Sequence, residues 1–251
     1  MDRSEQKRFL IEALADSSTA LLCNAYDFMG IHSPCTNWDI EYLTPEFPPM
    51  VGEALTIKLD CSTKDEEIQY EMEQKAPEEN LWYQLIERAE HSRIPQVVVI
   101  ESVGNYSYGA VIGDGMAKTM LAAGCAGFLT NGAVRDLDDV KKAGLKTFGG
   151  GKTVNHYSLR WSGLGEPVQI GGLTIRTGDL IHGDVDGVIT LPEEGWDKLP
   201  RACRYVADFE KAAHIILRRT DLGAAKKSAM VAELSQKYRA LIEAIRDPME
   251  F

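Results

Sequence analysis

The sequence has few cysteines, and they lack the spacing of a disulfide framework or a zinc site. The five cysteines are scattered over 251 residues, their number is odd, and no Cys-x-x-Cys pair occurs. Such usage is typical of a protein that works in a reducing compartment. We therefore expect a cytoplasmic protein without structural disulfides.

Long hydrophobic runs are also missing. No stretch approaches the roughly 18 consecutive apolar residues of a membrane span. The segment at residues 1–16, MDRSEQKRFLIEALAD, carries charges throughout instead of the apolar core of a signal peptide. We expect no membrane partner and no secretory leader.

An excess of basic residues is absent as well. The chain has 27 Lys and Arg against 38 Asp and Glu, a formal net charge of −11. A nucleic-acid-binding protein normally presents a basic face, so we expect no nucleic-acid partner. A local basic pocket for an anionic small molecule remains compatible with this balance. Hydrophobic residues at 44% and charged residues at 26% are typical of a globular chain.

Hydrophobic periodicity predicts an α/β organisation. The helical period predicts helices at 4–15, 18–29, 81–91, 116–123 and 136–143. Apolar runs and alternation predict strands at 52–61, 96–101 and 127–130, then short strands at 168–170, 173–175, 180–183 and 188–191. Two helices, at 193–219 and 223–246, complete the chain. The acidic segment 64–80 is interpreted as a solvated helix or an insertion.

Two segments resemble nucleotide-binding motifs, but each lacks a required glycine. The run ending in Gly151-Lys152-Thr153 has Lys146 where a phosphate loop needs its first glycine. The run beginning at Gly113 has Lys118 where a dinucleotide fingerprint needs its third glycine. The five histidines share no metal-ligand spacing. These patterns therefore favour neither a nucleotide site nor a histidine-built metal site.

Two strand-to-helix turns carry the chemistry that remains. They are Gly113-Asp114-Gly115-Met116-Ala117 and the turn from Asn131 to Asp136. In open α/β sheets, ligands bind outside the carboxyl ends of strands, and helix N-termini bind carboxylates. Arg135 offers a planar fork for a carboxylate, and two aspartates offer hard oxygen ligands for Mg²⁺ or Mn²⁺. A turn or cap role for Asp114 and a capping role for Arg135-Asp136 remain alternatives.

Both turns resemble signatures of the RraA-like family, which includes the 4-hydroxy-4-methyl-2-oxoglutarate aldolases. The first signature joins the Gly113–Ala117 run to Ala126-Gly127-Phe-Leu-Thr-Asn131-Gly132-Ala-Val-Arg135-Asp136. The second runs from Pro167 through Gly171-Gly172 and Gly178-Asp179 to Gly183-Asp184-Val-Asp186-Gly187-Val188 and Pro192. The likeness covers roughly residues 17–220. Asn131 stands where the family usually has Asp, a lost charge that bears on substrate choice.

The resemblance implies a layered α/β fold of the swivelling β/β/α kind. We expect a single RraA-like domain at residues 1–220 and a helical C-terminal extension at 221–251. It also implies a homotrimer or a homohexamer with active sites at subunit boundaries.

The resemblance further implies a divalent-metal-dependent class II pyruvate aldolase, which cleaves a 4-hydroxy-2-oxo acid and decarboxylates oxaloacetate. Asp136 and Asp114 would hold Mg²⁺, or Mn²⁺, directly or through water. Arg135 would bind the substrate carboxylate and the 2-oxo oxygen. Gly113, Gly115 and Met116 would form the carboxylate cradle. The C4 hydroxyl needs a base, for which a metal-bound hydroxide is one candidate. Glu210 of a neighbouring subunit is a candidate to assist, and a plain surface position on its helix is the alternative for Glu210.

A non-catalytic role is the alternative. Some relatives bind a ribonuclease and inhibit it, and those can lack the metal-binding acid. This chain keeps Asp114 and Asp136, which favours the enzyme.

Overall fold

The computed structural model describes residues 2–62, 76–104 and 109–245, so most of the acidic segment 64–80 lies outside the described residues. The chain divides into two compact units. The first comprises Met1–Asp16 and Pro34–Thr190, and the second comprises Ser17–Ser33 and Leu191–Phe251. The predicted division at residue 220 stays a prediction. No helix in the described ranges is long and apolar enough to cross a membrane.

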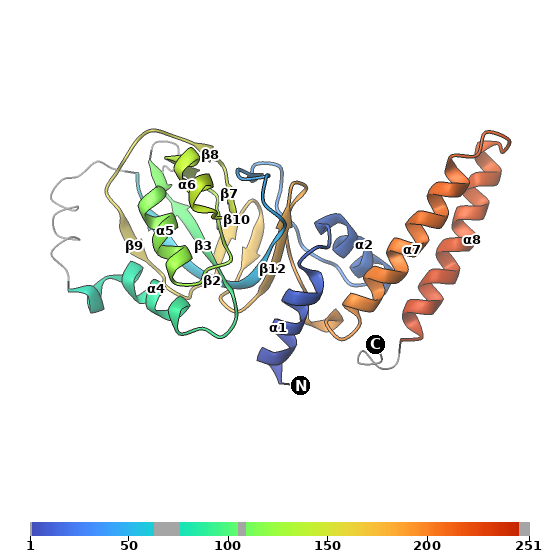
Figure 1. Cartoon of the computed structure of the whole chain (residues 1–251), viewed down its shortest axis with the longest axis horizontal. Coiled ribbons are helices and arrows are strands. Elements are labelled where there is room, and N and C mark those ends of the chain that lie inside the picture. Colours follow the sequence, from blue (N-terminus) through green and yellow to red (C-terminus); the bar gives the residue numbers. More distant parts are fainter. Residues whose placement is uncertain (1, 63–75, 105–108, 246–251) are drawn as a thin grey trace. The chain divides into compact units, whose positions relative to one another are not determined.

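A mixed sheet forms the centre of the first unit (Figure 1). Strands β2, β3, β5 and β7 run parallel, whereas β1, β12 and β13 pair antiparallel at the two sides. The strand order is β1 (Glu41–Tyr42), β7 (Thr147–Gly149), β5 (Gly127–Thr130), β3 (Gln96–Val103), β2 (Met50–Asp60), β12 (Leu180–Asp184) and β13 (Gly187–Thr190). A further strand, β9 (Arg160–Ser162), pairs with the end of β2.

Both faces of this sheet are covered, which explains why β3 reads as a continuous apolar run. Val98 and Ile100 pack on one face, against helices α4 (Leu81–Glu90), α5 (Asp114–Ala122) and α6 (Leu137–Ala143). Val97 and Val99 pack on the other face, against the hairpin of β10 (Val168–Ile170) and β11 (Leu173–Ile175). This layering agrees with the β/β/α organisation expected from the sequence.

A second sheet, which the sequence patterns did not predict, supports the candidate site. Its three short parallel strands are β4 (Ala110–Ile112), β6 (Ala133–Val134) and β8 (Gly151–Lys152). Strand β4 continues after one residue into α5, and β6 continues after two residues into α6. The carboxyl ends of two neighbouring parallel strands therefore lead into two helix starts.

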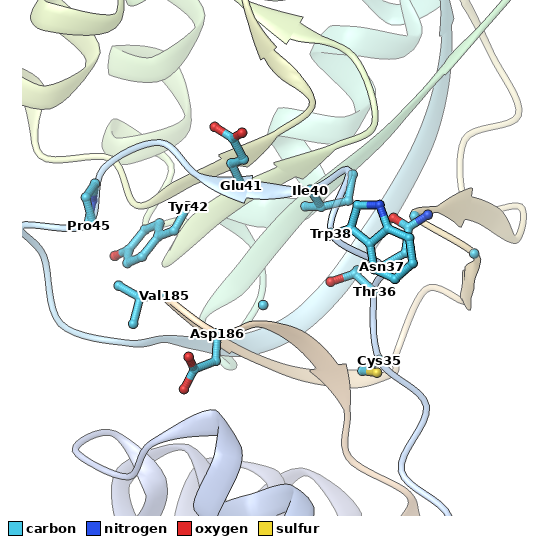
Figure 2. Close-up of a pocket in the computed structure, with 13 residues that line it drawn as sticks. Cys35, Thr36, Asn37, Trp38, Ile40, Glu41, Tyr42, Pro45, Val185 and Asp186 are labelled. Atoms are coloured by element: carbon cyan, nitrogen blue, oxygen red, sulfur yellow. The ribbon is translucent and has the colours of Figure 1, made fainter.

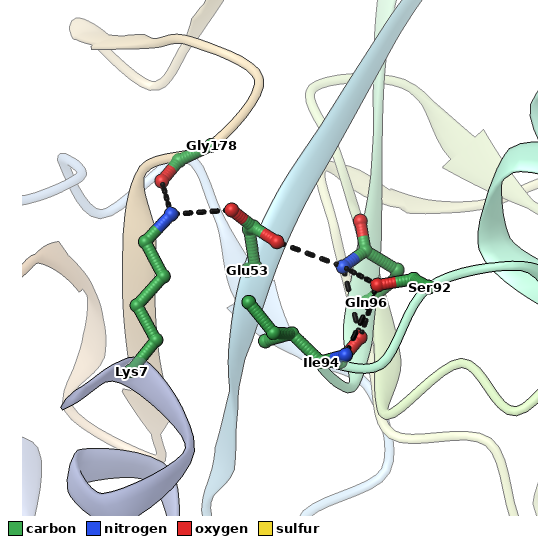
Figure 3. A network of polar contacts seen from close by, with 6 residues as sticks. All are labelled: Lys7, Glu53, Ser92, Ile94, Gln96 and Gly178. Carbon is green, nitrogen blue, oxygen red and sulfur yellow. Dashed lines mark hydrogen bonds and ion pairs between the residues drawn. The ribbon is translucent and has the colours of Figure 1, made fainter. Parts of the chain in front are cut away.

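Within the first unit, a buried polar network joins helix α1 (Arg3–Leu14) to strands β2 and β3 (Figure 3). The Lys7 ammonium donates to the Gly178 carbonyl at 2.6 Å and pairs with the Glu53 carboxylate. Gln96 donates to the other Glu53 oxygen at 3.1 Å. Lys7 is only 5% exposed, so the pairing compensates for the removal of its charge from water.

The second unit is helical. It contains α2 (Thr19–Met29), α7 (Leu199–Leu217) and α8 (Ala224–Glu243). The ring of Phe209 packs between Phe28 and Tyr238, with ring centroids 5.2 and 6.0 Å away. The prediction of one helix over 193–219 was wrong at its start. A 3₁₀ turn at Glu193–Gly195 comes first, and Pro200 then occupies the first turn of α7, where its missing N–H costs nothing.

Candidate functional site

The small second sheet brings the two sequence-predicted turns together. Strands β4 and β6 are parallel neighbours, with Ile112 opposite Val134. The Arg135 N–H donates to the Ile112 carbonyl at 3.0 Å, which extends the pairing beyond the last residue of β6. Gly113-Asp114 and Arg135-Asp136 thus leave adjacent strands at the same edge of the sheet, where ligands bind in open α/β sheets.

Asp136 has an unusual backbone conformation. Its φ is 54°, and among the described residues it is the one non-glycine residue with a positive φ. It precedes α6, which begins at Leu137 rather than at residue 136, but its side chain makes no capping hydrogen bond. Instead, Asp136 Oδ2 accepts a hydrogen bond from Arg135 Nε at 3.0 Å. Side-chain capping of α6, the alternative role, is therefore not what holds this carboxylate.

Gly113 allows the close approach of this pair. A Cβ atom at position 113 would lie 2.9 Å from Asp136 Oδ2 and 3.1 Å from Arg135 Nε. The first distance is shorter than real Cβ contacts, and the second would need the guanidinium to shift. A larger residue at 113 would therefore displace the Asp136 carboxylate and the Arg135 guanidinium from the positions that they occupy here.

Helix α5 begins at Asp114, two residues earlier than the periodicity predicted. Its first internal hydrogen bond runs from the Ala117 N–H to the Gly113 carbonyl, at 3.1 Å. The N–H groups of Asp114, Gly115 and Met116 therefore have no partner within the helix backbone. Together with the positive end of the helix dipole, they suit a carboxylate group.

Asp114 forms an ion pair one turn along α5. Lys118 Nζ lies 2.6 Å from Asp114 Oδ2. The hydrogen bond from Lys118 is the main reason why the pKa of the Asp114 carboxyl is lowered, and the Gly115 N–H and the charge of Arg135 act in the same direction. The same hydrogen bond raises the pKa of Lys118. Asp114 is thus held in its ionised form.

Asp114, Arg135 and Asp136 line one cavity of about 280 Å³. Two lining residues, His156 and Leu159, come from the connection between β8 and β9 and were missed by the sequence analysis. No motif spacing in the sequence links His156 to the two turns. Its position at the cavity depends on the path of the β8–β9 connection. The remaining lining residues are Ala110, Val111, Ile112, Gly113, Asp114, Gly115, Met116, Arg135 and Asp136.

Asn131 anchors the start of the second turn. Its side-chain oxygen accepts from the Ser102 N–H at 2.7 Å, and its amide nitrogen donates to the Ser102 carbonyl at 3.1 Å. This pairing joins the ends of β3 and β5 and uses the amide both as acceptor and as donor. An ionised aspartate can only accept, so the family's usual residue would not reproduce both bonds in this chain.

The donor set fits a hard divalent cation. The cavity contains two carboxylates, Asp114 and Asp136, and hard cations take oxygen ligands. Among the described residues, no group of three or more His, Cys, Asp or Glu side chains could hold a metal ion. Mg²⁺ commonly binds through one or two carboxylates and keeps several waters, so two protein ligands are compatible with it.

Glu210 lies in the second unit. It is on α7, where its side chain accepts a hydrogen bond from Asn24 Nδ2 at 2.9 Å. Its role toward a neighbouring subunit stays a prediction.

A larger hollow of about 850 Å³ lies elsewhere in the first unit (Figure 2). Its lining includes Glu41 and Asp186 but none of the Lys, Arg or His residues of the described chain. An anionic ligand would therefore be repelled there. The smaller cavity, which contains Arg135 and a helix N-terminus, is the better site for an anion.

Comparisons with known proteins place the chain in a family. The RraA-like family model, described as Aldolase/RraA, matches residues 19–190. A Halalkalibacterium halodurans protein named "Putative 4-hydroxy-4-methyl-2-oxoglutarate aldolase" is 40% identical over 121 residues, which are 45% of this chain and 55% of that protein. The chain thus spans about half the length of this curated relative.

Two solved structures share the fold. One is an uncharacterized protein from Pseudomonas syringae pv. tomato, with a TM-score of 0.65, 21% identity, and coverage of 92% of this chain and 94% of that chain. The other is from Streptomyces coelicolor and is described as an unusual member of the RNase ES inhibitor RraA protein family. Its TM-score is 0.61 at 21% identity, over 84% of this chain and 96% of that chain. The expected mixed α/β fold with C-terminal helices is confirmed, and the chain belongs to the RraA-like family.

Proposed function

We propose that this protein is a divalent-metal-dependent lyase that cleaves a 4-hydroxy-2-oxo acid to pyruvate and also decarboxylates oxaloacetate. The observation that carries the proposal is the Arg135-Asp136 pair. It is held in a left-handed turn against Gly113 and beside the start of α5, in one cavity. The aldolase name of the 40%-identical relative supports the same reaction class.

Arg135 and the start of α5 account for recognition of a 2-oxo acid. The N–H groups of Gly115 and Met116, which have no partner within the helix backbone, would donate hydrogen bonds to the substrate carboxylate. The guanidinium of Arg135 keeps donors beyond the Nε used by Asp136, and these would reach the carboxylate and the 2-oxo oxygen. Leu159 and Met116 contribute to the apolar part of the cavity, together with Ala110, Val111 and Ile112.

Asp136 and Asp114 would hold the divalent cation, Mg²⁺ or Mn²⁺. When bound, such a cation supplies Lewis-acid polarisation of the 2-oxo group. The backbone conformation of Asp136 and the hydrogen bond from Arg135 hold its carboxylate in place. Asp114, which Lys118 keeps ionised, would bind directly or through a water molecule.

Both reactions pass through the enolate of pyruvate, so one site can serve both. C–C cleavage and loss of CO₂ each leave negative charge on the former 2-oxo oxygen. Donors that are already oriented toward this position lower the barrier more than they strengthen substrate binding. Arg135 would donate there, and no lysine Schiff base is needed.

Pyruvate release tests the proposal. The purified protein is assayed with oxaloacetate and with 4-hydroxy-4-methyl-2-oxoglutarate, before and after treatment with EDTA, and after Mg²⁺ or Mn²⁺ is restored. We expect both substrates to yield pyruvate, EDTA to abolish the release, and the added metal to recover it. Absence of pyruvate under all conditions would contradict the proposal and leave the regulatory alternative, which a ribonuclease inhibition assay would then address.

A further inference from the structure

Among the described residues that line the candidate cavity, His156 is the one titratable side chain that forms no ion pair. Asp114 is paired with Lys118, and Asp136 is paired with Arg135. The other lining residues carry no titratable side chain. His156 is exposed and forms no hydrogen bond or ion pair with any residue in the described part of the chain.

The segment that carries His156 is nevertheless fixed. The Asn155 carbonyl accepts a hydrogen bond from the Ala110 N–H of β4 at 3.0 Å. Tyr157 and Leu159 pack against the core that includes α5 and α6, and Ser158 is buried. His156 is therefore an accessible imidazole on an anchored stretch of chain, directed to the same cavity as the Arg135-Asp136 pair.

Retro-aldol cleavage needs a proton acceptor that oxaloacetate decarboxylation does not need. The hydroxyl at C4 must lose its proton as the C3–C4 bond breaks, whereas decarboxylation breaks a bond to a carboxylate that carries no proton. Histidine is the side chain best suited to accept and return a proton near neutral pH. The paired carboxylates and the guanidinium of the cavity are poorly suited to that task.

We propose that His156 transfers this proton, an inference that rests on the proposed function. The neutral imidazole removes the proton from the C4 hydroxyl, and the O–H electron pair forms the new carbonyl. The electron pair of the C3–C4 bond moves into the pyruvate enolate. The imidazolium then returns the proton to C3, which gives pyruvate and restores the neutral imidazole. One proton moves from oxygen to carbon, and no external oxidant or reductant is required.

The test compares two substrates in His156→Gln. Glutamine keeps a polar side chain but cannot take up a proton, so we expect kcat for 4-hydroxy-4-methyl-2-oxoglutarate to fall at least about 100-fold. We expect kcat for oxaloacetate to stay within about threefold, because water can protonate the enolate. His91→Gln, at the end of α4 and outside the cavity, is the matched control and should change neither rate.

Two further measurements separate proton transfer from a structural role. Calorimetric titration with oxalate, a planar dianion that resembles the enolate, should give the same dissociation constant for parent and His156→Gln. Added imidazole should restore retro-aldol turnover to His156→Ala, which a structural role would not predict.

The results that would contradict the role of His156 differ from those that would contradict the proposed function. If His156→Gln cleaves the hydroxy acid as fast as the parent, or if both reactions fall together, His156 is not the proton carrier, although the proposed function stands. If the parent releases pyruvate from neither substrate, the proposed function fails and the role of His156 fails with it.

Discussion

At the scale of the residue, the backbone of Asp136 is the feature that best separates a functional carboxylate from a helix cap. A left-handed conformation costs an L-residue roughly 1–2 kcal/mol, and aspartate and asparagine tolerate it better than most residues. The Asp136 side chain gives no capping bond in return and instead contacts Arg135. Local strain of this kind is concentrated at sites where it places a reacting group.

Asp136→Asn isolates the charge of this side chain. Asparagine accepts the same backbone conformation, so we expect the melting temperature to stay within about 2 °C of the parent. If Asp136 holds the metal as proposed, metal-dependent turnover should fall at least about 100-fold, because a metal ligand contributes no less than the partners that orient it. Calorimetry and oxaloacetate kinetics provide the two measurements. Parent-like turnover would remove Asp136 from the site.

Arg135→Lys tests the planar fork. Lysine keeps the charge, but one ammonium group cannot contact Asp136, the carboxylate and the developing enolate oxygen together. Loss of a donor to a transition-state oxyanion costs about 10²–10³ in rate, and the loss should appear in kcat as well as in KM. A raised KM with unchanged kcat would show that Arg135 only anchors the ground-state carboxylate.

Lys118→Met tests whether the ionisation of Asp114 controls the pH dependence of turnover. Lys118 lowers the pKa of Asp114, so the carboxylate stays ionised to lower pH than usual. Removal of the ammonium should return this pKa toward its ordinary value, and the acid limb of the kcat/KM profile should move to higher pH. Lys142→Met is the control, because Lys142 forms an equivalent surface pair with Asp139 on α6, outside the cavity lining. Superimposable acid limbs for Lys118→Met and the parent would show that Asp114 ionisation does not control turnover.

At the scale of the element, the long segments were predictable, as were the short strands β10 and β11 on either side of the Gly171-Gly172 turn, whereas the strands of the small second sheet were not. Strand β3 and helix α4 have clear apolar patterns over 8 and 10 residues. Strands β4, β6 and β8 have only two or three residues each and pair in parallel, so no hairpin turn marks them, yet they bring the two strand-to-helix turns together. The motif residues were therefore identifiable from the sequence, whereas their adjacency and the place of His156 depend on long-range pairing.

The buried network of α1 gives a prediction about stability. Lys7→Met leaves the Glu53 carboxylate without its cation, although Gln96 still donates to it. Removal of one partner from a buried pair destabilises by about 3 kcal/mol, whereas removal of both charges is often nearly neutral. We expect a lower urea midpoint for Lys7→Met and a substantial recovery in Lys7→Met/Glu53→Gln. Equal midpoints for the parent and the single variant would show that the pair contributes little.

At the scale of the whole molecule, exposed apolar side chains point to self-association. Trp38 is 91% exposed and Val185 is 69% exposed, and both line the 850 Å³ hollow of the first unit. On α7, in the second unit, Ile215 is 68% exposed and Leu217 is 50% exposed. Exposed apolar surface of this kind commonly marks an interface, so the expected homotrimer or homohexamer stays our prediction.

Light scattering on the full chain should therefore give three or six times the monomer mass of 27.8 kDa. Charged substitutions in the hollow of the first unit, Trp38→Glu with Val185→Glu, should lower that mass, because a buried unpaired carboxylate opposes association. If the site is completed by a neighbouring subunit, the dissociated variant should lose turnover in parallel, and Glu210→Gln should impair the intact oligomer. A parent that is strictly monomeric, or a monomeric variant with full turnover, would remove Glu210 from the site and confine the chemistry to the cavity beside Asp136.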